Sequence, residues 1–310
     1  MPLIVTQPYK VTFTFTFPAS AGFFASGWTG ITSTGTIDQL DFSNDTVSIT
    51  AASVTATLGA MGVNSASAGY FAGGRVGTSS ASLQQIDKFV FNTQTDSVLS
   101  AVLSTFRRDG AGLNSSLYGY FASGYSTSNL SSIDGINFSN DTDRGIAASV
   151  ATARLYSAGA QSSLKGYVLG GENAAGFQFS VITALTFAGE TTATLAATLP
   201  SNQSQQAGFN SSTKGYSAGG YSGGTKYTQI NALTFNTETL AAISATLSTI
   251  RTYGSAVNST LSGYIAGGYA TSSYVASVDA LLFSNETSST LSTSLSTARG
   301  GSPSAQIGSL

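Results

Sequence analysis

Short runs of apolar and small residues alternate along this chain with segments rich in Gly, Ser, Thr and Asn, and one such run recurs six times. Each copy holds Gly, an aromatic residue, two further positions, and then Gly-Gly or Ser-Gly. The first glycines are Gly22, Gly69, Gly119, Gly166, Gly215 and Gly263, so the repeat is 47 to 50 residues long. Repeats of this length, with strand-like patterns and no helical period, are typical of β-propellers. We therefore expect an all-β fold with six blades in one ring.

Each repeat contains the pattern of four strands. In the last full repeat we expect them at 254–258, 263–268, 278–283 and 290–295. The tetrapeptide SNET begins at Ser284, between the third and fourth strands, and every repeat has a counterpart rich in Asn, Asp, Gly or Thr. Such segments favour tight hairpin turns. The pattern thus predicts blades of four strands in a repeat of about 48 residues.

The third strand carries the clearest core signal, because a branched residue begins it and Phe ends it in every repeat. The branched residues are Ile37, Ile86, Ile133, Ile182, Ile230 and Val278. The aromatic residues are Phe42, Phe91, Phe138, Phe187, Phe235 and Phe283. Side chains of these types, repeated in register, suit the space between neighbouring blades. We expect all six phenylalanines to be buried there.

An amide side chain marks the first strand and indicates how the ring closes. The markers are Asn64, Asn114, Gln161, Asn210, Asn258 and Gln306. Gln306 lies near the C-terminus, whereas the first repeat has Phe17 at the expected position. We therefore expect the C-terminal tail to supply the first strand of the first blade, which removes exposed sheet edges. The amides would form a polar network at the ring centre.

The alternating segment VTFTFTF at 11–17 is then surplus to the ring. We expect residues 1–18 to form an extension strand used for attachment, and residues 19–310 to form the propeller. An alternating aromatic strand seldom stays unpaired. The segment could instead compete for the ring-closing slot, add to an outer sheet edge, or pair with another chain.

Composition excludes several classes of function. Only 8% of the residues are charged and the net charge is −2, so we expect no nucleic-acid partner. The chain has no Cys and no His, which excludes disulfides and thiolate or imidazole metal sites, and we expect no cofactor. The N-terminus lacks a basic region followed by an apolar run, so we expect no secretory signal peptide. No apolar stretch approaches the roughly 18 residues of a membrane helix, so we expect no membrane insertion.

Two further features recur at fixed places. Gly-Gly ends the second strand at Gly73, Gly170, Gly219 and Gly267, and Arg ends the fourth strand at Arg107, Arg154, Arg251 and Arg299. With them, the repeat resembles the kelch repeat of galactose-oxidase-type propellers, although Phe and Leu or Val replace its usual Tyr and Trp. The resemblance implies that the first strand is innermost and that the loops after the second and fourth strands share one face. The copper chemistry of galactose oxidase does not carry over without His and Cys.

The position directly after each glycine pair changes its chemistry from repeat to repeat. It holds Trp28, Arg75, Tyr125, Glu172, Tyr221 and Tyr269, and the loops that follow differ in length. Variable loops on one face of a rigid scaffold commonly carry binding sites. Aromatic rings that stack on sugar faces, with Arg and Glu for the hydroxyl groups, suit a glycan. The alternative is that these tyrosines only pack over the neighbouring blade.

Catalytic patterns are weak by comparison. The in-register arginines could clamp an anion, as in six-bladed sialidases, but the S-x-D-x-G-x-T-W box is absent, and an Arg shared by four repeats favours a structural bond between blades. Glycosidases need two carboxylates at one bond, and nothing pairs Glu172 with Asp109, the only candidates on the expected face. Without His, a His-dependent triad is excluded, and no motif supports a Ser–Lys pair.

We therefore expect a non-enzymatic binding or structural propeller, located on a virion or an extracellular surface. A phage fibre, tail-tip or capsid-decoration component is favoured, because an uncharged surface rich in Ser, Thr and Gly is common in such β-proteins. It would attach to other virion or surface proteins through the N-terminal strand and bind a host glycan. The alternative is a bacterial propeller lectin or surface adhesin. A polysaccharide hydrolase or lyase fits less well, because carboxylates are sparse.

Overall fold

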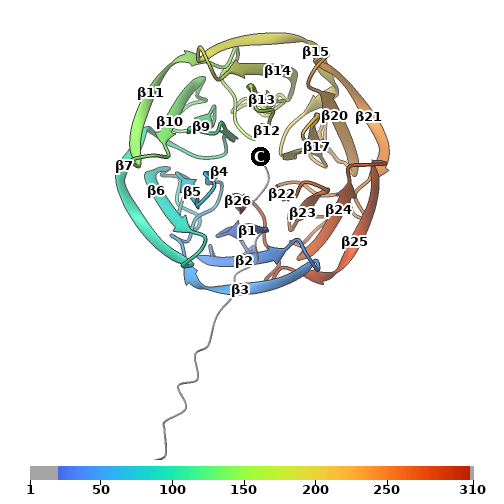
Figure 1. Cartoon of the computed structure of the whole chain (residues 1–310). Coiled ribbons are helices and arrows are strands. Elements are labelled where there is room, and N and C mark those ends of the chain that lie inside the picture. The colour runs from blue at the N-terminus through green and yellow to red at the C-terminus, as the bar shows by residue number, and fades with distance from the viewer. Residues whose placement is uncertain (1–19, 308–310) are drawn as a thin grey trace, which may run out of the picture.

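The computed structural model describes residues 20–307, and these residues form six four-stranded antiparallel blades around a central axis (Figure 1). The described range contains strands, turns and loops, and no helix in it could cross a membrane. In each blade the strand of four residues lies at the axis, and the strand that follows the hairpin turn with the tetrapeptide rich in Asn, Asp, Gly or Thr lies at the rim. The sequence-based prediction of an all-β, six-bladed propeller is confirmed.

The strands run in the same spatial order in every blade, from the axis to the rim. The first blade holds β26 (Ser304–Ile307), β1 (Ala21–Ala25), β2 (Thr36–Asp41) and β3 (Thr46–Ser53). The second holds β4 (Met61–Asn64), β5 (Ala68–Ala72), β6 (Leu83–Val90) and β7 (Thr95–Arg107). The third holds β8 (Ala111–Asn114), β9 (Tyr118–Ala122), β10 (Ser132–Asn137) and β11 (Thr142–Ser149).

The remaining three blades repeat this arrangement. The fourth holds β12 (Ala158–Gln161), β13 (Lys165–Leu169), β14 (Phe179–Thr186) and β15 (Thr191–Gln203). The fifth holds β16 (Ala207–Asn210), β17 (Lys214–Ala218), β20 (Gln229–Thr234) and β21 (Thr239–Thr246). The sixth holds β22 (Ser255–Asn258), β23 (Ser262–Ala266), β24 (Ser277–Leu282) and β25 (Thr287–Ser294). A small hairpin, β18 (Tyr221–Ser222) and β19 (Thr225–Lys226), projects from the loop after β17.

The C-terminal strand closes the ring. β26 pairs antiparallel with β1, and Gln306 lies opposite Gly22, as the amide marker predicts. The amides also bond between adjacent blades around the axis: the backbone N–H of Asn258 donates to Oε1 of Gln306 at 2.6 Å, and that of Asn64 donates to Oδ1 of Asn114 at 2.8 Å. The slot beside β1 is thus filled by the tail. The extension expected at residues 1–18 lies outside the described residues.

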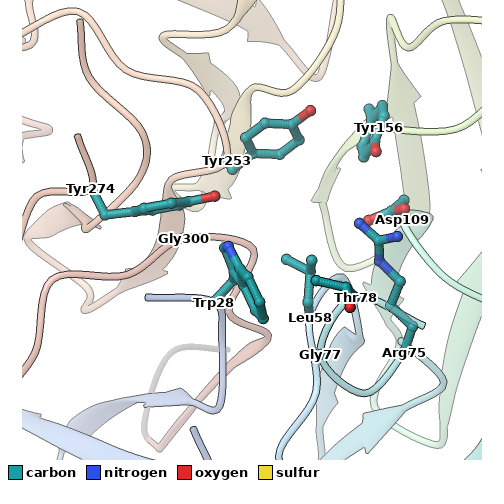
Figure 2. Close-up of a pocket in the computed structure, with 10 residues that line it drawn as sticks. All are labelled: Trp28, Leu58, Arg75, Gly77, Thr78, Asp109, Tyr156, Tyr253, Tyr274 and Gly300. Atoms are coloured by element: carbon teal, nitrogen blue, oxygen red, sulfur yellow. The ribbon is translucent and has the colours of Figure 1, made fainter. Parts of the chain in front are cut away.

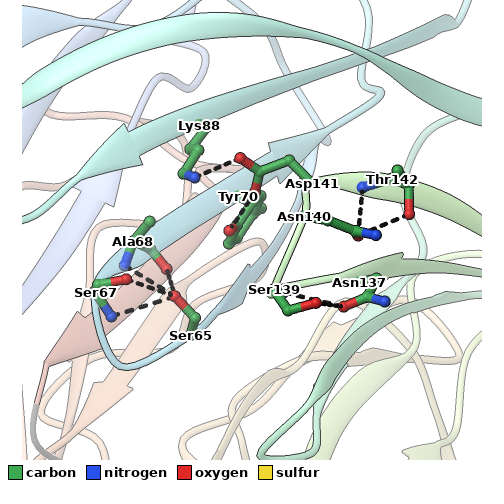
Figure 3. A network of polar contacts seen from close by, with 10 residues as sticks. All are labelled: Ser65, Ser67, Ala68, Tyr70, Lys88, Asn137, Ser139, Asn140, Asp141 and Thr142. Atoms are coloured by element: carbon green, nitrogen blue, oxygen red, sulfur yellow. Dashed lines mark hydrogen bonds and ion pairs between the residues drawn. The ribbon is translucent and has the colours of Figure 1, made fainter.

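An aromatic and ionic contact joins neighbouring blades near the hairpin turns (Figure 3). The hydroxyl group of Tyr70 in β5 donates to Asp141 at 2.8 Å, and Nζ of Lys88 lies 2.5 Å from the same carboxylate. The ring of Tyr70 stacks on Phe138, with 5.2 Å between the ring centroids. The pattern recurs between the later blades, with the Tyr and acid pairs Tyr120–Glu190, Tyr167–Glu238, Tyr216–Glu286 and Tyr264–Asp45.

The boundary between the first and second blades departs from this pattern at both partners. Phe23 replaces the tyrosine and stacks on Phe91 with 5.0 Å between the centroids, and the turn carries Gln94 in place of an acid. A phenyl ring has no hydroxyl group to donate, so an acid in that turn would lack its partner. The two substitutions therefore compensate each other.

The prediction for the third-strand residues is only partly right. The branched starting residues are at most 2% exposed, as expected. The phenylalanines do lie between blades, but only Phe91 is buried, at 2% exposed, and the other five are half-buried. Each follows the last residue of its strand, at the start of the turn, and five of the six are partly exposed there. Complete burial of all six was therefore a wrong expectation.

The four in-register arginines are at most 1% exposed and are bound inside the molecule. Nη1 of Arg299 lies 2.7 Å from Oδ2 of Asp38, and Nη2 donates to the carbonyl oxygen of Phe24 at 2.9 Å, both in the next blade. Arg107 and Arg251 form the same kind of pair with Asp134 and Asp279. The predicted structural bond between blades is confirmed. The anion-clamp reading is wrong, because no ligand can reach these side chains.

Candidate functional site

A ring of six residues closes the axis at one end of the propeller. Each lies between the rim strand of one blade and the axial strand of the next, two residues after the position of the buried arginines. The members of this inner ring are Gly59, Asp109, Tyr156, Gln205, Tyr253 and Gly301. The backbone N–H of each donates to the carbonyl oxygen of the member before it at 2.6–3.0 Å, and Gly59 donates to Gly301 to complete the circle.

Every member of the inner ring has a φ between 57° and 71°. Glycine adopts this left-handed conformation freely, but other residues do so rarely, and such strain gathers at functional sites. Four of the six members carry side chains despite it. The closed backbone ring holds those side chains, Asp109, Tyr156, Gln205 and Tyr253, in fixed places around the axis.

The six positions singled out from the sequence form a second circle just outside the inner ring. Each makes a backbone bridge to the residue that precedes an inner-ring member. The bridges are Trp28–Gly300, Arg75–Leu58, Tyr125–Arg108, Glu172–Leu155, Tyr221–Ser204 and Tyr269–Thr252. These loops therefore share one face of the propeller, the face that the kelch resemblance implies.

A cavity of about 410 Å³ opens on this face (Figure 2). Its lining consists of Trp28, Leu58, Arg75, Gly77, Thr78, Asp109, Tyr156, Tyr253, Tyr274 and Gly300. The glycines of the inner ring let two lining residues pack close beside them, since a side chain at Gly59 would collide with the Asp109 carboxylate and one at Gly301 would collide with Leu58. The cavity volume lies within the range of small-molecule sites, about 300–1,000 Å³.

Four of the ten residues that line the cavity are aromatic. Figure 2 shows Trp28 and Tyr274 on one side, with Tyr253 and Tyr156 beyond them. The rings of Tyr156 and Tyr253 meet edge to face, with 5.2 Å between centroids and an interplanar angle of 72°. Tyr274 packs against Tyr269, with 5.0 Å between centroids. The cavity therefore offers flat apolar surfaces with hydroxyl groups at their edges.

The polar side of the cavity holds Asp109 and Arg75, and Figure 2 shows the guanidinium directed toward the carboxylate. Burial raises the pKa of Asp109 to about 7, although Arg108, Arg75 and Tyr156 act in the opposite direction. Nε of Arg108 lies 3.2 Å from Oδ2 of Asp109. Nε of Arg75 is buried and has no hydrogen-bond partner within residues 20–307.

Burial, followed by the charge of Asp109, raises the pKa of Tyr156. Burial also raises the pKa of Tyr253, with smaller contributions from Tyr156 and Asp109. Both hydroxyl groups are therefore protonated at neutral pH and can donate hydrogen bonds. Neither is suited to act as a base, since a phenol with a raised pKa gives up its proton less readily.

The structure brings together only part of the predicted set. Trp28 and Arg75 line the cavity, and Tyr269 supports it through Tyr274. Tyr125 lines a second hollow farther out. Glu172 accepts a hydrogen bond from Oγ of Ser204 at 2.6 Å. Neither Glu172 nor Tyr221 lines either of these two hollows.

Sequence reasoning missed the cavity residues Tyr156, Tyr253 and Tyr274. A signal was present for Tyr156 and Tyr253, because each stands two residues after a repeated Arg. In the four blades that carry this Arg, the position holds Asp109, Tyr156, Tyr253 and Gly301, so only Tyr occurs twice. Tyr274 bridges Tyr269 at a position that also varies between blades, where the counterparts are Ser33, Asn129, Gln178 and Lys226, and sequence reasoning did not single this position out.

The lining contains few groups for catalysis or metal binding. Asp109 is the only carboxylate among the described residues that line the cavity. Within residues 20–307, no three acidic, His or Cys side chains gather as metal ligands. The arrangement is suited to non-covalent recognition of a ligand with flat apolar faces and several hydroxyl groups.

Comparisons with known proteins add no assignment. No protein-family model matches the chain, and a search of curated proteins finds no match either.

Proposed function

We propose that this protein is a non-enzymatic, kelch-like propeller that binds a saccharide in the axial cavity. The observation that carries the proposal is the wall of Trp28, Tyr274, Tyr253 and Tyr156 beside the polar pair Asp109 and Arg75. The C–H faces of a sugar ring stack on aromatic rings, and its hydroxyl groups need donors and acceptors nearby. The cavity supplies both kinds of group within one small volume.

Binding without hydrolysis fits the carboxylates better than catalysis does. Glycoside hydrolysis uses two carboxyl groups placed on either side of one bond. In the described part of the cavity wall, Asp109 has no second carboxylate facing it. Glu172, the other acid on this face, is held by Ser204 away from the lining. The pair of acids that a glycosidase requires is therefore not assembled around this cavity.

We place this binding propeller on a phage virion, as a fibre, tail-tip or capsid-decoration component. The composition supports this role, with 8% charged residues and neither Cys nor His. The position of the chain ends supports it as well. Oγ of Ser20 donates to the carbonyl oxygen of Ile307 at 3.4 Å, and β1 runs from there to the loop of Trp28 on the cavity face.

Both ends of the described chain therefore lie on the face opposite the cavity. Attachment through residues 1–18 would leave the cavity directed away from the particle and toward host glycan. A bacterial lectin or surface adhesin would use the same cavity. The two roles differ only in the surface that carries the protein, which is a bacterial cell in one and a phage particle in the other. Mass spectrometry of purified particles distinguishes the two roles, because only a virion component copurifies with phage.

A glycan array with purified variants tests the binding proposal. We expect the wild-type protein to bind a defined set of saccharides and Trp28→Ala to lose at least about tenfold in affinity, as for a lost stacking ring. Tyr221→Ala is the matched control, because Tyr221 stands in the same circle but lines no part of the cavity, and its binding should stay unchanged. Circular dichroism verifies the fold of each variant. Unchanged binding by Trp28→Ala, or no binding by the wild type, would overturn the proposal.

A further inference from the structure

We infer that the saccharide site continues from the axial cavity into a second hollow over the boundary between the second and third blades, so that its ligand is an extended saccharide chain. This inference rests on the proposed function and specifies the class of ligand. The second hollow has a volume of about 550 Å³. It is lined by Ser80, Ala81, Ser82, Phe106, Arg108, Tyr125, Ser126 and Thr127.

Arg108 connects the two volumes. Its Nε lies 3.2 Å from the carboxylate of Asp109, which lines the axial cavity. Its guanidinium carbon lies 4.6 Å from the centroid of the Tyr125 ring in the second hollow. The remaining side of the guanidinium is held by Ser82, since Nη1 donates to its Oγ at 2.9 Å. One fixed side chain therefore lines the second hollow and contacts the acid that lines the axial cavity.

The loop after Arg75 also borders both volumes. Gly77 and Thr78 line the axial cavity, and residues 80–82 line the second hollow. Between them, the carbonyl oxygen of Ser80 accepts a hydrogen bond from Nη1 of Arg108 at 3.0 Å. A ligand that leaves the axial cavity across this loop therefore meets Arg108 and Tyr125 next.

The second hollow presents aromatic surface that the fold does not need. The Phe106 side chain is 52% exposed although it stands on the rim strand β7. The Tyr125 ring is held by the cation–π contact with Arg108 and by its hydroxyl group, which donates to the carbonyl oxygen of Thr127 at 3.2 Å. Two placed rings with hydroxyl groups around them form a second stacking surface for a sugar.

A comparison of the blades shows that these residues are specific to this place. The positions equivalent to Phe106 hold Ala56, Ala153, Asn202, Ile250 and Ala298. The positions equivalent to Arg108 hold Leu58, Leu155, Ser204, Thr252 and Gly300. Blades with these other residues form the same sheets, so blade architecture requires neither Phe106 nor Arg108. Their presence together at one boundary, beside the axial cavity, points to a ligand.

Oligosaccharides of increasing length test the inference. The probes are chitin, β-glucan and mannan fragments from disaccharide to octasaccharide, measured by isothermal titration calorimetry. We expect the wild-type affinity to rise about tenfold between the short and long members of the bound series, as the second rings are engaged. Phe106→Ala should bind the disaccharide normally and lose this gain. Ile250→Ala, at the equivalent position of another blade, should behave as the wild type.

The outcomes separate this inference from the proposed function. Binding that depends on Trp28 but not on chain length, or a length gain that survives Phe106→Ala, would overturn the second subsite and leave the axial site standing. If none of the three series binds to the wild type, both proposals fail for these ligands, and a positive glycan array then supplies the series that decides. Phe106 is largely exposed, so its truncation should leave the melting temperature unchanged.

Discussion

At the scale of single residues, the buried charges between blades show how the repeat tolerates variation. Arg299 and Asp38 are fully buried as an ion pair. At the boundary between the fourth and fifth blades, Gln203 and Asn231 stand in the same places, and Nδ2 of Asn231 donates to Oε1 of Gln203 at 3.1 Å. The fold thus accepts a neutral pair where it elsewhere has a charged one. A buried charge without an opposite charge also occurs: Arg154 meets Thr183 at the equivalent place, and hydrogen bonds to Thr183 and to the carbonyl oxygen of Val168 hold its guanidinium.

This reasoning predicts a strong difference between single and double variants. Arg299→Gln alone should lower the free energy of unfolding by about 3–5 kcal/mol, since it leaves Asp38 buried and charged with the hydrogen bonds of Ser296 but without an opposite charge. Adding Asp38→Asn reproduces the natural neutral pair and should restore most of the loss. Urea unfolding followed by circular dichroism measures both changes. A double variant as unstable as the single one would show that the charge itself is needed.

The Asp109 carboxyl group should make stability depend on pH. Its folded-state pKa of about 7 lies above the value of about 4 expected in the unfolded chain, so the folded protein keeps the proton longer. Stability therefore falls as pH rises from about 4 to about 7, by up to about 1.4 kcal/mol per pH unit, and then levels off. Asp109→Asn removes this contribution.

Thermal unfolding of wild type and Asp109→Asn at pH 5 and pH 8 checks the sign. The variant should gain stability relative to the wild type on going to pH 8. Burial, followed by the charge of Asp87, also raises the pKa of Asp96 to about 7, but this group is common to both proteins and cancels in the difference. An equal difference at the two pH values would mean that Asp109 titrates well below neutrality.

At the scale of elements, the decisive strand is β26. It is only four residues long, yet it joins the two ends of the described chain in one sheet, by pairing with β1. Its residue Ala305 packs with Phe23 and Phe91 in one apolar cluster. Without β26 the inner edge of β1 would be exposed and available for pairing with another chain.

Two truncations should therefore have opposite effects. Deleting residues 304–310 should open the ring, lower the melting temperature and cause aggregation through β1. Deleting residues 1–17 should leave the propeller folded, because β26 already fills the slot beside β1. The shortened protein should no longer assemble with its partner protein. Circular dichroism and size-exclusion chromatography separate these results. Loss of the fold in the N-terminal truncation would show that the ring needs that segment after all.

At the scale of the whole molecule, stability comes from the closed ring and its six blade boundaries within residues 20–307, with no covalent cross-link available. The chain contains no Cys and no His. We therefore expect the melting temperature to be the same with and without EDTA, and with and without a reductant, in differential scanning fluorimetry. Calcium held by carboxylate and carbonyl oxygens is the remaining possibility for a metal. A lower melting temperature in EDTA would reveal such a site.

The sequence by itself determined the number of blades, the register of their strands and the ring closure at Gln306. These properties depend on a short repeated pattern, which marks the same strand positions in every blade and can be counted without coordinates. The sequence also predicted which face carries the variable loops, and it identified Trp28 and Arg75. It predicted the buried arginines as structural because four repeats share them. These are local or periodic properties, and a periodic fold makes them visible.

Only the tertiary structure decided which variable residues meet. Tyr156 and Tyr253 come from blades that lie far apart in the chain, and the closed backbone ring turns both toward the axis. Glu172 and Tyr221 occupy equivalent positions yet line no part of the cavity, because a circle of six loops cannot bring all its members to one off-centre hollow. The lining joins Asp109, Tyr156 and Tyr253 of the inner ring with Trp28 and Tyr274 from other blades, a meeting that depends on the closed ring and that no single repeat contains.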